Sequence, residues 1–583
     1  MSLSQAVQRW SVARLSPPRL DGRAIGFWAL TSGIGLLVAA PLLLLVLSSF
    51  RHVTTETLGF RLTDLTLDNY LRAYTSPTSY TLLLNSFGFA LGSTALATLL
   101  GATAAFLAER SDLRFRQVIP MLVLVPLVMP GVVKGVAWIL LLSPSIGLLN
   151  QLWQALFGGP LLSVYSLAAM IWVDGVSMSP LAFLLIGAIL QHMNPALEEA
   201  AAVSGALPLQ VLRRITLPLL APALAGVLVL LFLRGIESFE IPMLLGFNAG
   251  IFVFSTSIYH SLRSSFPPEY GLGFAYSMSL VVIAAGALYL YQRTLRDAAR
   301  YATVTGKAYQ PRRVALGAWR YLAWVFLLMY GVLAILLPLA VLMWGSLLRF
   351  YRPPSPAALA AVSLSNYSQI LTDPRFLDVV KNTVVLGLAS GLGVMALALL
   401  VSWYVHRTDV QARGLLELVA FIPYALPSVA IGVAFMILFL SFPNPIYNTI
   451  WIIVLAYTVH YLPIASRFTH AAIVQVHKEL EEAAWTSGAS LWPTLRRVWV
   501  PLLAPALLNG LVFVLVLSFK VMTIAALLQG PDSLVLSVFM WNLWDRGGSS
   551  GPTAALSVML VVVVSVLTLI SRRVAHGAAA RAL

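Results

Sequence analysis

The sequence predicts an all-α integral membrane protein with about twelve transmembrane helices, built as two parallel six-helix repeats. Of its 583 residues, 59% are hydrophobic and only 10% are charged, whereas soluble domains carry about 25% charged residues. A polar segment, EEAAAVSGALPLQVLRRITLPLLAP at 198–222, returns without a gap as EEAAWTSGASLWPTLRRVWVPLLAP at 481–505. Composition alone does not produce such a polar repeat in so apolar a chain. We therefore interpret the chain as two fused copies of one unit.

Hydrophobic stretches of about 20 residues, long enough to cross a bilayer, give the spans in order. The first half supplies 26–48, 81–107, 118–142, 163–190, 218–236 and 273–292. The second half supplies 320–346, 379–404, 416–440, 448–468, 501–526 and 553–571. Four arginines precede the first span, as in a signal peptide, but its length and the lack of a clear small-residue cleavage site favour a retained anchor.

These spans divide the chain into domains. They are an N-terminal tail (1–25), a first repeat (26–292), a basic linker (293–319), a second repeat (320–571) and a C-terminal tail (572–583). Because each half has an even number of spans, both halves enter the membrane in the same direction. The expected symmetry is a pseudo-twofold axis along the membrane normal.

The repeat extends beyond the polar segment. Residue pairs in the earlier spans share an offset of 297, among them Asn85 with Asn382, Arg110 with Arg407, Pro126 with Pro423, and Pro130 with Pro427. The later pairs share an offset of 283. The first half therefore has 14 extra residues near 143–162, which we expect to form an external loop with an amphipathic stretch. The prolines are expected to break the third span of each half.

The distribution of basic residues gives the orientation. With both termini in the cytoplasm, the cytoplasmic segments hold 25 of the 37 Lys and Arg residues when Arg320 and Arg467, at the cytoplasmic ends of their spans, are included, as the positive-inside rule requires. This orientation places both polar repeats, 194–217 and 477–500, in the cytoplasm. It also explains the net charge of +15 as a topological signal, so we do not expect nucleic acid as a partner.

Each polar repeat has the pattern of a helix, a turn and a second helix. Its Glu-Ala-Ala stretch favours helix, and Gly205 and Gly488 stand where a helix would end in a left-handed turn. A second short helix with an arginine pair should follow, and then Pro218 or Pro501 in the first turn of the next span, where the missing N–H costs nothing. An ordinary connecting loop is the alternative for one copy. Two matched copies favour a docking element.

Charged residues within spans are rare and mark candidate functional positions. The candidates for a pathway or gate are Asp174, Arg234, Glu237, Glu240 and Lys520. Alternative roles are mutual neutralisation for Arg234 with Glu237, three residues apart, and extension of the lysine side chain to the membrane interface for Lys520.

Both polar repeats resemble the EAA loop of membrane subunits of ATP-driven importers that use a substrate-binding protein, the type I ABC importers. That loop reads Glu-Ala-Ala, three residues, Gly, nine residues, then a hydrophobic residue, any residue, Leu and Pro. The second copy departs from it only in Val500 for Leu. The resemblance assigns ATPase coupling to Glu199, Ala200, Ala201, Gly205, Pro218, Glu482, Ala483, Ala484, Gly488 and Pro501.

The fusion of two such halves resembles the iron(III), thiamine and phosphonate permease group. The stretches ESFEIPMLLG (237–246) and LSVFMWNLWDRGG (536–548) look most like its ferric-iron branch. The resemblance implies a permease of the bacterial inner membrane, with two copies of an ABC ATPase and a periplasmic or lipoprotein solute-binding protein as partners besides membrane lipid. It implies iron(III) as cargo. Thiamine, a phosphonate, a polyamine or another small solute are the alternatives.

No enzymatic constellation is visible in the sequence. It lacks a GxxxxGK[ST] phosphate loop and has no cysteine, so we expect no cofactor, no metal site and no ATP hydrolysis by this chain itself. An ion-gradient-driven secondary transporter has the same number of spans and is the rival from another class. It is less favoured because few membrane-embedded acids are available for ion coupling.

Overall fold

The structure, a computed structural model, describes residues 22–52, 65–159, 162–192, 196–299, 313–442, 445–547 and 550–582. Its described part is helical, apart from loops and two isolated β-bridges. The first half contributes α2 (Gly22–Ser49), α3 (Asp68–Thr75), α4 (Pro77–Glu109), α5 (Ile119–Val128), α6 (Gly131–Leu142), α7 (Leu148–Phe157), α8 (Leu167–His192), α9 (Ala196–Val203), α10 (Pro208–Val211), α11 (Leu217–Ile236), α12 (Phe254–Tyr259) and α13 (Tyr270–Ala299).

The second half repeats this order. It contributes α14 (Trp319–Gly331), α15 (Leu337–Ser346), α16 (Pro356–Ala360), α17 (Ser365–Leu371), α18 (Phe376–Arg407), α19 (Arg413–Phe421), α20 (Ser428–Ser441), α21 (Ile450–Gln475), α22 (Glu479–Thr486), α23 (Leu491–Thr494), α24 (Val500–Lys520), α25 (Thr523–Leu528), α26 (Leu536–Gly547) and α27 (Ser550–Ala582). α14 and α15 are joined by a π-helical turn, η6 (Val332–Leu336), and act as one span.

Ten helices in the described ranges are long and apolar enough to cross a membrane without interruption. Two further spans are broken, as their prolines predicted. The segments Arg116–Val128 and Gly131–Leu142 meet at 94°, and Arg413–Ala425 and Ser428–Ser441 meet at 107°. Counted as one span each, they complete the predicted twelve.

Several helices begin or end at residues other than the predicted span limits. The eleventh span does not run to residue 526, because α24 ends at Lys520 and α25 is a separate short helix. A third bent pair, Pro242–Ala249 with Phe254–Ser264 at 70°, lies where we expected only a loop. α13 continues to Ala299, inside the predicted linker, and α27 continues to Ala582, inside the predicted tail. Most of the predicted N-terminal tail lies outside the described residues.

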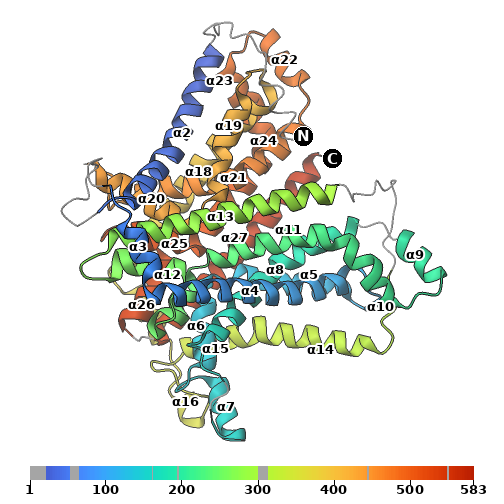
Figure 1. Cartoon of the computed structure of the whole chain (residues 1–583), viewed down its shortest axis with the longest axis vertical. Coiled ribbons are helices and arrows are strands. Elements are labelled where there is room, and N and C mark those ends of the chain that lie inside the picture. Colours follow the sequence, from blue (N-terminus) through green and yellow to red (C-terminus); the bar gives the residue numbers. More distant parts are fainter. Residues whose placement is uncertain are drawn as a thin grey trace.

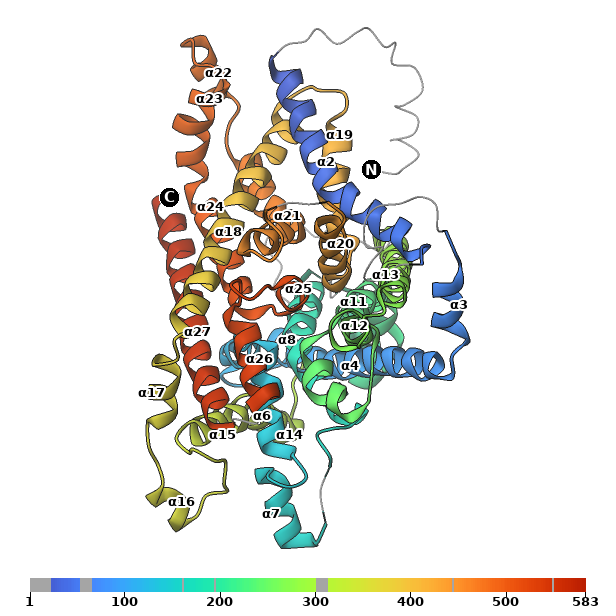
Figure 2. The same ribbon diagram turned by 90° about the vertical axis from the view of Figure 1, so that its left-hand side faces the viewer.

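The two halves exchange their first spans. α2, at the top left in Figure 1, packs along α19 and α20 of the second half. α14, which opens the second half, lies along the first half and contacts α5. The loops α9–α10 and α22–α23 lie at two separate corners of the molecule, and Figure 2 shows α22 and α23 at the end opposite to α7 and α16.

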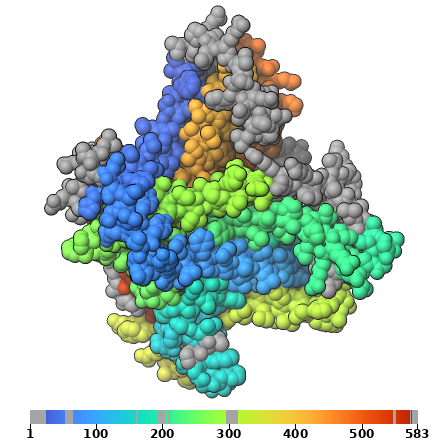
Figure 3. All heavy atoms as spheres, in the orientation of Figure 1, coloured from blue at the N-terminus to red at the C-terminus, as the bar shows by residue number. Residues whose placement is uncertain are grey.

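The 14-residue insertion of the first half forms α7, which protrudes at one end of the molecule (Figure 3). Asn150, fully buried, fixes this helix to the body. Its amide donates to the carbonyls of Leu142 at 2.7 Å and Leu162 at 2.9 Å. The expected amphipathic stretch is therefore a helix with one polar anchor and exposed apolar side chains such as Leu156.

Candidate coupling loops and a central charged cluster

Both polar repeats end their first helix in the same left-handed turn. Gly205 has a φ of +83° and Gly488 a φ of +79°. One residue later, the amide of Ala206 donates to the carbonyl of Ala201 at 3.0 Å, and in the second copy Ala489 donates to Ala484 at 3.0 Å. This six-to-one hydrogen bond with glycine just past the helix end is the Schellman motif. The prediction of a left-handed glycine turn is confirmed in both copies.

The predicted second short helix is not separate from the span. α10 runs through a π-helical turn, η2 (Leu212–Thr216), directly into α11, and α23 runs through η8 (Leu495–Trp499) into α24. Pro218 and Pro501 follow these turns by two residues. Proline has no N–H and its ring collides with the carbonyl four residues earlier, so a local π-turn lets the helix continue instead of ending. In each half the end of the loop and the following span therefore form one continuous helix.

An arginine at the end of α4 or α18 fixes each loop to the bundle. Arg110 forms an ion pair with Glu198 at 3.3 Å, and their side chains are only 4% and 15% exposed. Glu198 also accepts a hydrogen bond from the Thr216 hydroxyl at 2.7 Å, which ties the start of the loop to its end. In the second half, Arg407 donates to the carbonyl of Ile473, just before the loop, at 2.7 Å, and its guanidinium carbon lies 5.0 Å from the centroid of the Trp499 ring in the loop.

Glu481, the counterpart of Glu198, accepts a hydrogen bond from the Trp403 indole N–H at 2.8 Å and is 3% exposed. The first glutamate of each EEAA motif is thus a structural residue facing inward, a role that sequence reasoning missed. The recurrence of Arg110 as Arg407 was the signal that could have found it.

The other motif residues face outward. Glu482, Ala483 and Gly488 are exposed and Ala484 is half-buried. Ala200 is exposed and Ala201 half-buried, while the side chain of Glu199, in α9, lies outside what the structure describes. Large apolar side chains join this surface: Val203 is 89% exposed, and Leu207 and Trp492 are also exposed. Each loop therefore presents a small-residue and apolar face with nothing of this chain covering it among the described residues.

The intramembrane charges gather where the halves meet, at the break of the third span. Lys520, the last residue of α24, donates to the carbonyl of Leu127 near the end of α5. Glu240 packs against Gly131, the first residue of α6, where an added Cβ would lie 3.0 Å from the Glu240 Cβ. The Lys520 cation thus lies at a helix C-terminus and the Glu240 anion at a helix N-terminus. Both positions are favourable because of the helix dipoles. Glu240 also accepts a hydrogen bond at 3.3 Å from the amide of Met522 in the other half.

Asp174 lies in the same cluster but is buried in α8. One carboxylate oxygen accepts a hydrogen bond from the Ser238 hydroxyl at 3.1 Å, and Lys134 is close enough for electrostatic attraction. In the second half the corresponding residue is Tyr457, whose hydroxyl donates to the carbonyl of Val521 at 2.7 Å. Equivalent positions therefore make a hydrogen bond between spans in both halves, through the carboxylate of Asp174 in the first half and through the neutral hydroxyl of Tyr457 in the second.

Arg234 and Glu237 complete the cluster. They form an ion pair at 2.5 Å at the end of α11, with side chains 56% and 19% exposed. This confirms that the two neutralise each other locally. The pair also interacts electrostatically with Tyr424 and Tyr461 of the second half, which sequence reasoning did not identify. Lys520 occupies the position equivalent to Glu237, so the two halves approach the axis with opposite charges.

The five predicted pathway residues are thus brought together, and Lys134 joins them. Among the residues that the structure describes, no group of three or more His, Asp or Glu side chains is arranged to hold a metal ion. The carboxylates of the cluster are instead interspersed with cations.

Comparison with known proteins shows a similarity to membrane components of transport systems. Residues 395–579 match the model of the binding-protein-dependent transport system inner membrane component. The ferric transport system permease protein FbpB of Actinobacillus pleuropneumoniae is 25% identical over 453 residues, which cover 76% of this chain and 64% of that protein. The second half of this chain is therefore similar to the membrane components of binding-protein-dependent transport systems. The internal repeat extends the same architecture to the first half.

Other transport permeases are similar to this chain over different extents. The Fe(3+)-transport system permease protein FbpB 2 of Haemophilus influenzae is 23% identical, with 83% of this chain and 88% of that protein covered. The putative 2-aminoethylphosphonate transport system permease protein PhnV of Salmonella typhimurium is 27% identical over 243 residues, 41% of this chain and 88% of that protein. The chain spans only about two thirds of the first FbpB relatives, 64% and 66% of their lengths.

Among solved structures, a bacterial ABC transporter for the import of the acidic polysaccharide alginate is similar at a TM-score of 0.39 and 20% identity. The match covers 50% of this chain and 98% of that one.

Proposed function

We propose that this chain is a two-lobed membrane subunit of an ATP-driven importer. Its two cytoplasmic loops, 194–217 and 477–500, would dock two copies of a separate ABC ATPase. The observation that carries the proposal is the duplicated loop: the same Schellman turn, a buried glutamate and an inward arginine anchor recur in both halves. A connecting loop with no partner would not need the same stabilising contacts in both halves.

The geometry of the loops suits the transmission of force. The outward face of Glu482, Ala483 and Gly488 would contact the ATPase, and small side chains permit close approach of a partner helix. The continuous helices α10–α11 and α23–α24 would carry the movement of the ATPases to the central cluster, since α11 ends two residues after Arg234 and α24 ends at Lys520. The two loops lie at separate corners (Figure 1), so closure of an ATPase pair would draw the two halves together.

For cargo we propose iron(III), supported by the ferric-transport names of the FbpB relatives. A phosphonate is the next candidate, because PhnV aligns with one half. Thiamine, a polyamine or another small solute remain further alternatives from the sequence. A solute-binding protein at the outer face would deliver the cargo, and Asp174, Arg234, Glu237, Glu240 and Lys520 would line or gate its route through the inner membrane. Both termini would lie in the cytoplasm, following the basic residues.

The docking proposal is tested by co-purification of the permease with candidate ATPase subunits. We compare the wild type with a G205V/G488V variant and a matched G205N/G488N variant. Valine disfavours positive φ, whereas asparagine tolerates it, and no atom lies within 4 Å of the added Cβ at either site. We expect the valine variant to lose the ATPase and the asparagine variant to retain it.

Two results would contradict the proposal. Retention of the ATPase by the valine variant would show that the turns are not part of the docking surface. Solute uptake into ATPase-free vesicles under an ion gradient would favour the secondary transporter instead. Uptake of radiolabelled iron and 2-aminoethylphosphonate by the reconstituted wild-type complex would then distinguish the cargoes.

A further inference from the structure

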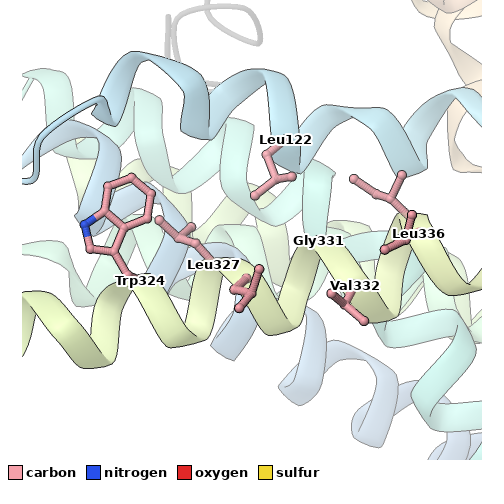
Figure 4. Close-up of a pocket in the computed structure, with 8 residues that line it drawn as sticks. Leu122, Trp324, Leu327, Gly331, Val332 and Leu336 are labelled. Carbon is pink, nitrogen blue, oxygen red and sulfur yellow. The ribbon is translucent and has the colours of Figure 1, made fainter.

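An apolar groove opens on the membrane-facing side of the seam between α5 and α14. It has a volume of about 370 Å³ and is lined by Leu122 of α5 and, from α14 to η6, by Trp324, Leu327, Leu328, Gly331, Val332, Ile335 and Leu336. Figure 4 shows Leu122 pointing down towards the helix that carries Leu327 and Gly331. Every lining side chain is hydrocarbon or indole. The groove lies within a predicted span, so lipid and not water would fill it.

The opposite seam, related by the internal repeat, is filled by the protein itself. Phe27, the counterpart of Trp324, is 0% exposed and packs its ring 5.5 Å from that of Tyr404. Trp324 is 40% exposed, and the residue equivalent to Tyr404 is the smaller Leu107. The two seams therefore differ at this position because of particular side chains and not because of the fold.

Basic residues surround the end of this groove where the second half begins. Arg114, Arg313 and Arg320 are exposed and Arg116 is half-buried. Arg320 lies four residues before Trp324, on the same face of α14. Glu109 and Asp112 are the acidic side chains of this region among the described residues, and Asp112 is engaged by the amide of Leu316 at 3.0 Å. The local balance is positive.

The backbone holds these basic residues in place. The amide of Val314 donates to the carbonyl of Arg110 at 2.7 Å, and the amide of Asp112 donates to the carbonyl of Val314 at 3.2 Å. Deeper in the bundle, the Tyr330 hydroxyl lies 2.9 Å from the Ser179 hydroxyl and ties α14 to α8 behind the groove. The groove and the basic cluster are therefore parts of one fixed seam.

We propose that this seam binds an anionic phospholipid, with an acyl chain in the groove and the phosphate among Arg114, Arg116, Arg313 and Arg320. A basic cluster at the membrane surface attracts acidic headgroups, and the exposed Trp319 and Tyr321 are of the types enriched at the interface. The bound lipid completes the packing of α14 against the first half, a role that Phe27 and Tyr404 perform at the other seam. This inference is independent of the cargo and of the ATPase.

The test is native mass spectrometry of the full-length permease titrated with phosphatidylglycerol or phosphatidylcholine of matched chains. We expect tighter binding of phosphatidylglycerol. G331L should abolish this preference by filling the groove, since a Cβ at this position already lies 3.2 Å from a Leu122 methyl group. The matched control is G33L, on the corresponding span α2 where no atom lies within 4 Å of the added Cβ, and it should bind lipid as the wild type does.

The headgroup part is tested separately. R320Q and R116Q should each lower the affinity for phosphatidylglycerol about fivefold, the effect of one basic residue at an anionic surface, and leave phosphatidylcholine binding unchanged. Equal binding of the two lipids by the wild type would overturn the anionic headgroup. Unchanged phosphatidylglycerol binding by G331L would overturn the groove as the site. A G331L protein that elutes as the wild type does on gel filtration excludes misfolding as the cause of any loss.

Discussion

At the scale of single residues, the closest approach between spans depends on glycine. A Cβ built on Gly101 of α4 would lie 2.5 Å from the Ala182 Cβ and 2.7 Å from the backbone carbonyl of Ser179 in α8. Both distances are far below van der Waals contact, and the neighbouring atoms belong to backbone or to a side chain that cannot rotate away. Spans associate through such small residues because lipid offers no hydrophobic force between helices.

We therefore expect G101A to separate α4 from α8 and to lower stability by about 1–3 kcal/mol, the usual cost of overpacking. The matched change G33A lies in α2, where the added Cβ meets no atom within 4 Å, and should be neutral or stabilising by up to about 1 kcal/mol because alanine favours helix. The measurement is the midpoint of heat unfolding in detergent micelles. Equal midpoints for the two variants would show that the helices part without cost.

The arrangement of the charges at the centre also depends on local contacts. Lys520 meets the C-terminal end of α5 and Glu240 the N-terminal start of α6, so the two ends of the broken span receive opposite charges. Both side chains come from the end of the fifth span of a half, but from different halves. The symmetry of the backbone is thus retained while the chemistry of the two halves differs.

At the scale of elements, three π-helical turns share one cause. η2, η6 and η8 each end two residues before a proline, namely Pro218, Pro338 and Pro501. The wider turn accommodates the proline and keeps the helix continuous. In two of the three cases the turn lies between a polar repeat and the span that follows it, and it therefore sets the rotation of that repeat about the helix axis.

The double variant P218A/P501A should restore ordinary helix, which has about 100° of rotation per residue, and turn both loops relative to the spans. Because alanine favours helix interiors over proline, the unfolding midpoint should not fall. The ratio of cargo transported to ATP hydrolysed should fall strongly in the reconstituted complex. P222A/P505A is the matched control, one turn further along the same helices. If P218A/P501A transports with wild-type efficiency, the π-turns have no role in coupling.

The sequence predicted most elements because each carried its own local signal. Apolar runs marked the spans, Pro126 and Pro130 marked a break, and Gly205 and Gly488 marked left-handed turns. The bent pair at 242–264 was missed since a short buried helix pair lacks the length that identifies a span. The inward role of Glu198 was missed because its partner, Arg110, is distant in sequence. The opposite charges of Glu237 and Lys520 come together at the centre because of the way the two halves pack. No single segment of the sequence encodes that packing.

At the scale of the whole molecule, each half is incomplete without the other. α2 packs on the second half, where Gly26 lies against the Tyr404 hydroxyl, and α14 packs on the first half through Tyr330. Two further contacts join the halves: Arg263 donates to the carbonyl of Leu527 at 3.0 Å, and the ring centroids of Tyr259 and Trp541 are 5.6 Å apart. The covalent connection between the halves is therefore not what holds them together.

We predict that a permease cleaved at a protease site inserted within 300–312 will remain one particle in mild detergent, because the exchanged spans and the central contacts persist after the cut. The halves expressed separately should aggregate or be degraded, since each would expose the surface that the other's first span covers. Co-expression should restore a complex that co-purifies through a tag on one half.

Y330A combined with the cleavage should weaken this association, because it removes the anchor of α14, whereas Y321A, at an exposed position of the same helix, should not. Dissociation of the cleaved wild type under these conditions would mean that the linker, and not the exchange of spans, unites the two halves.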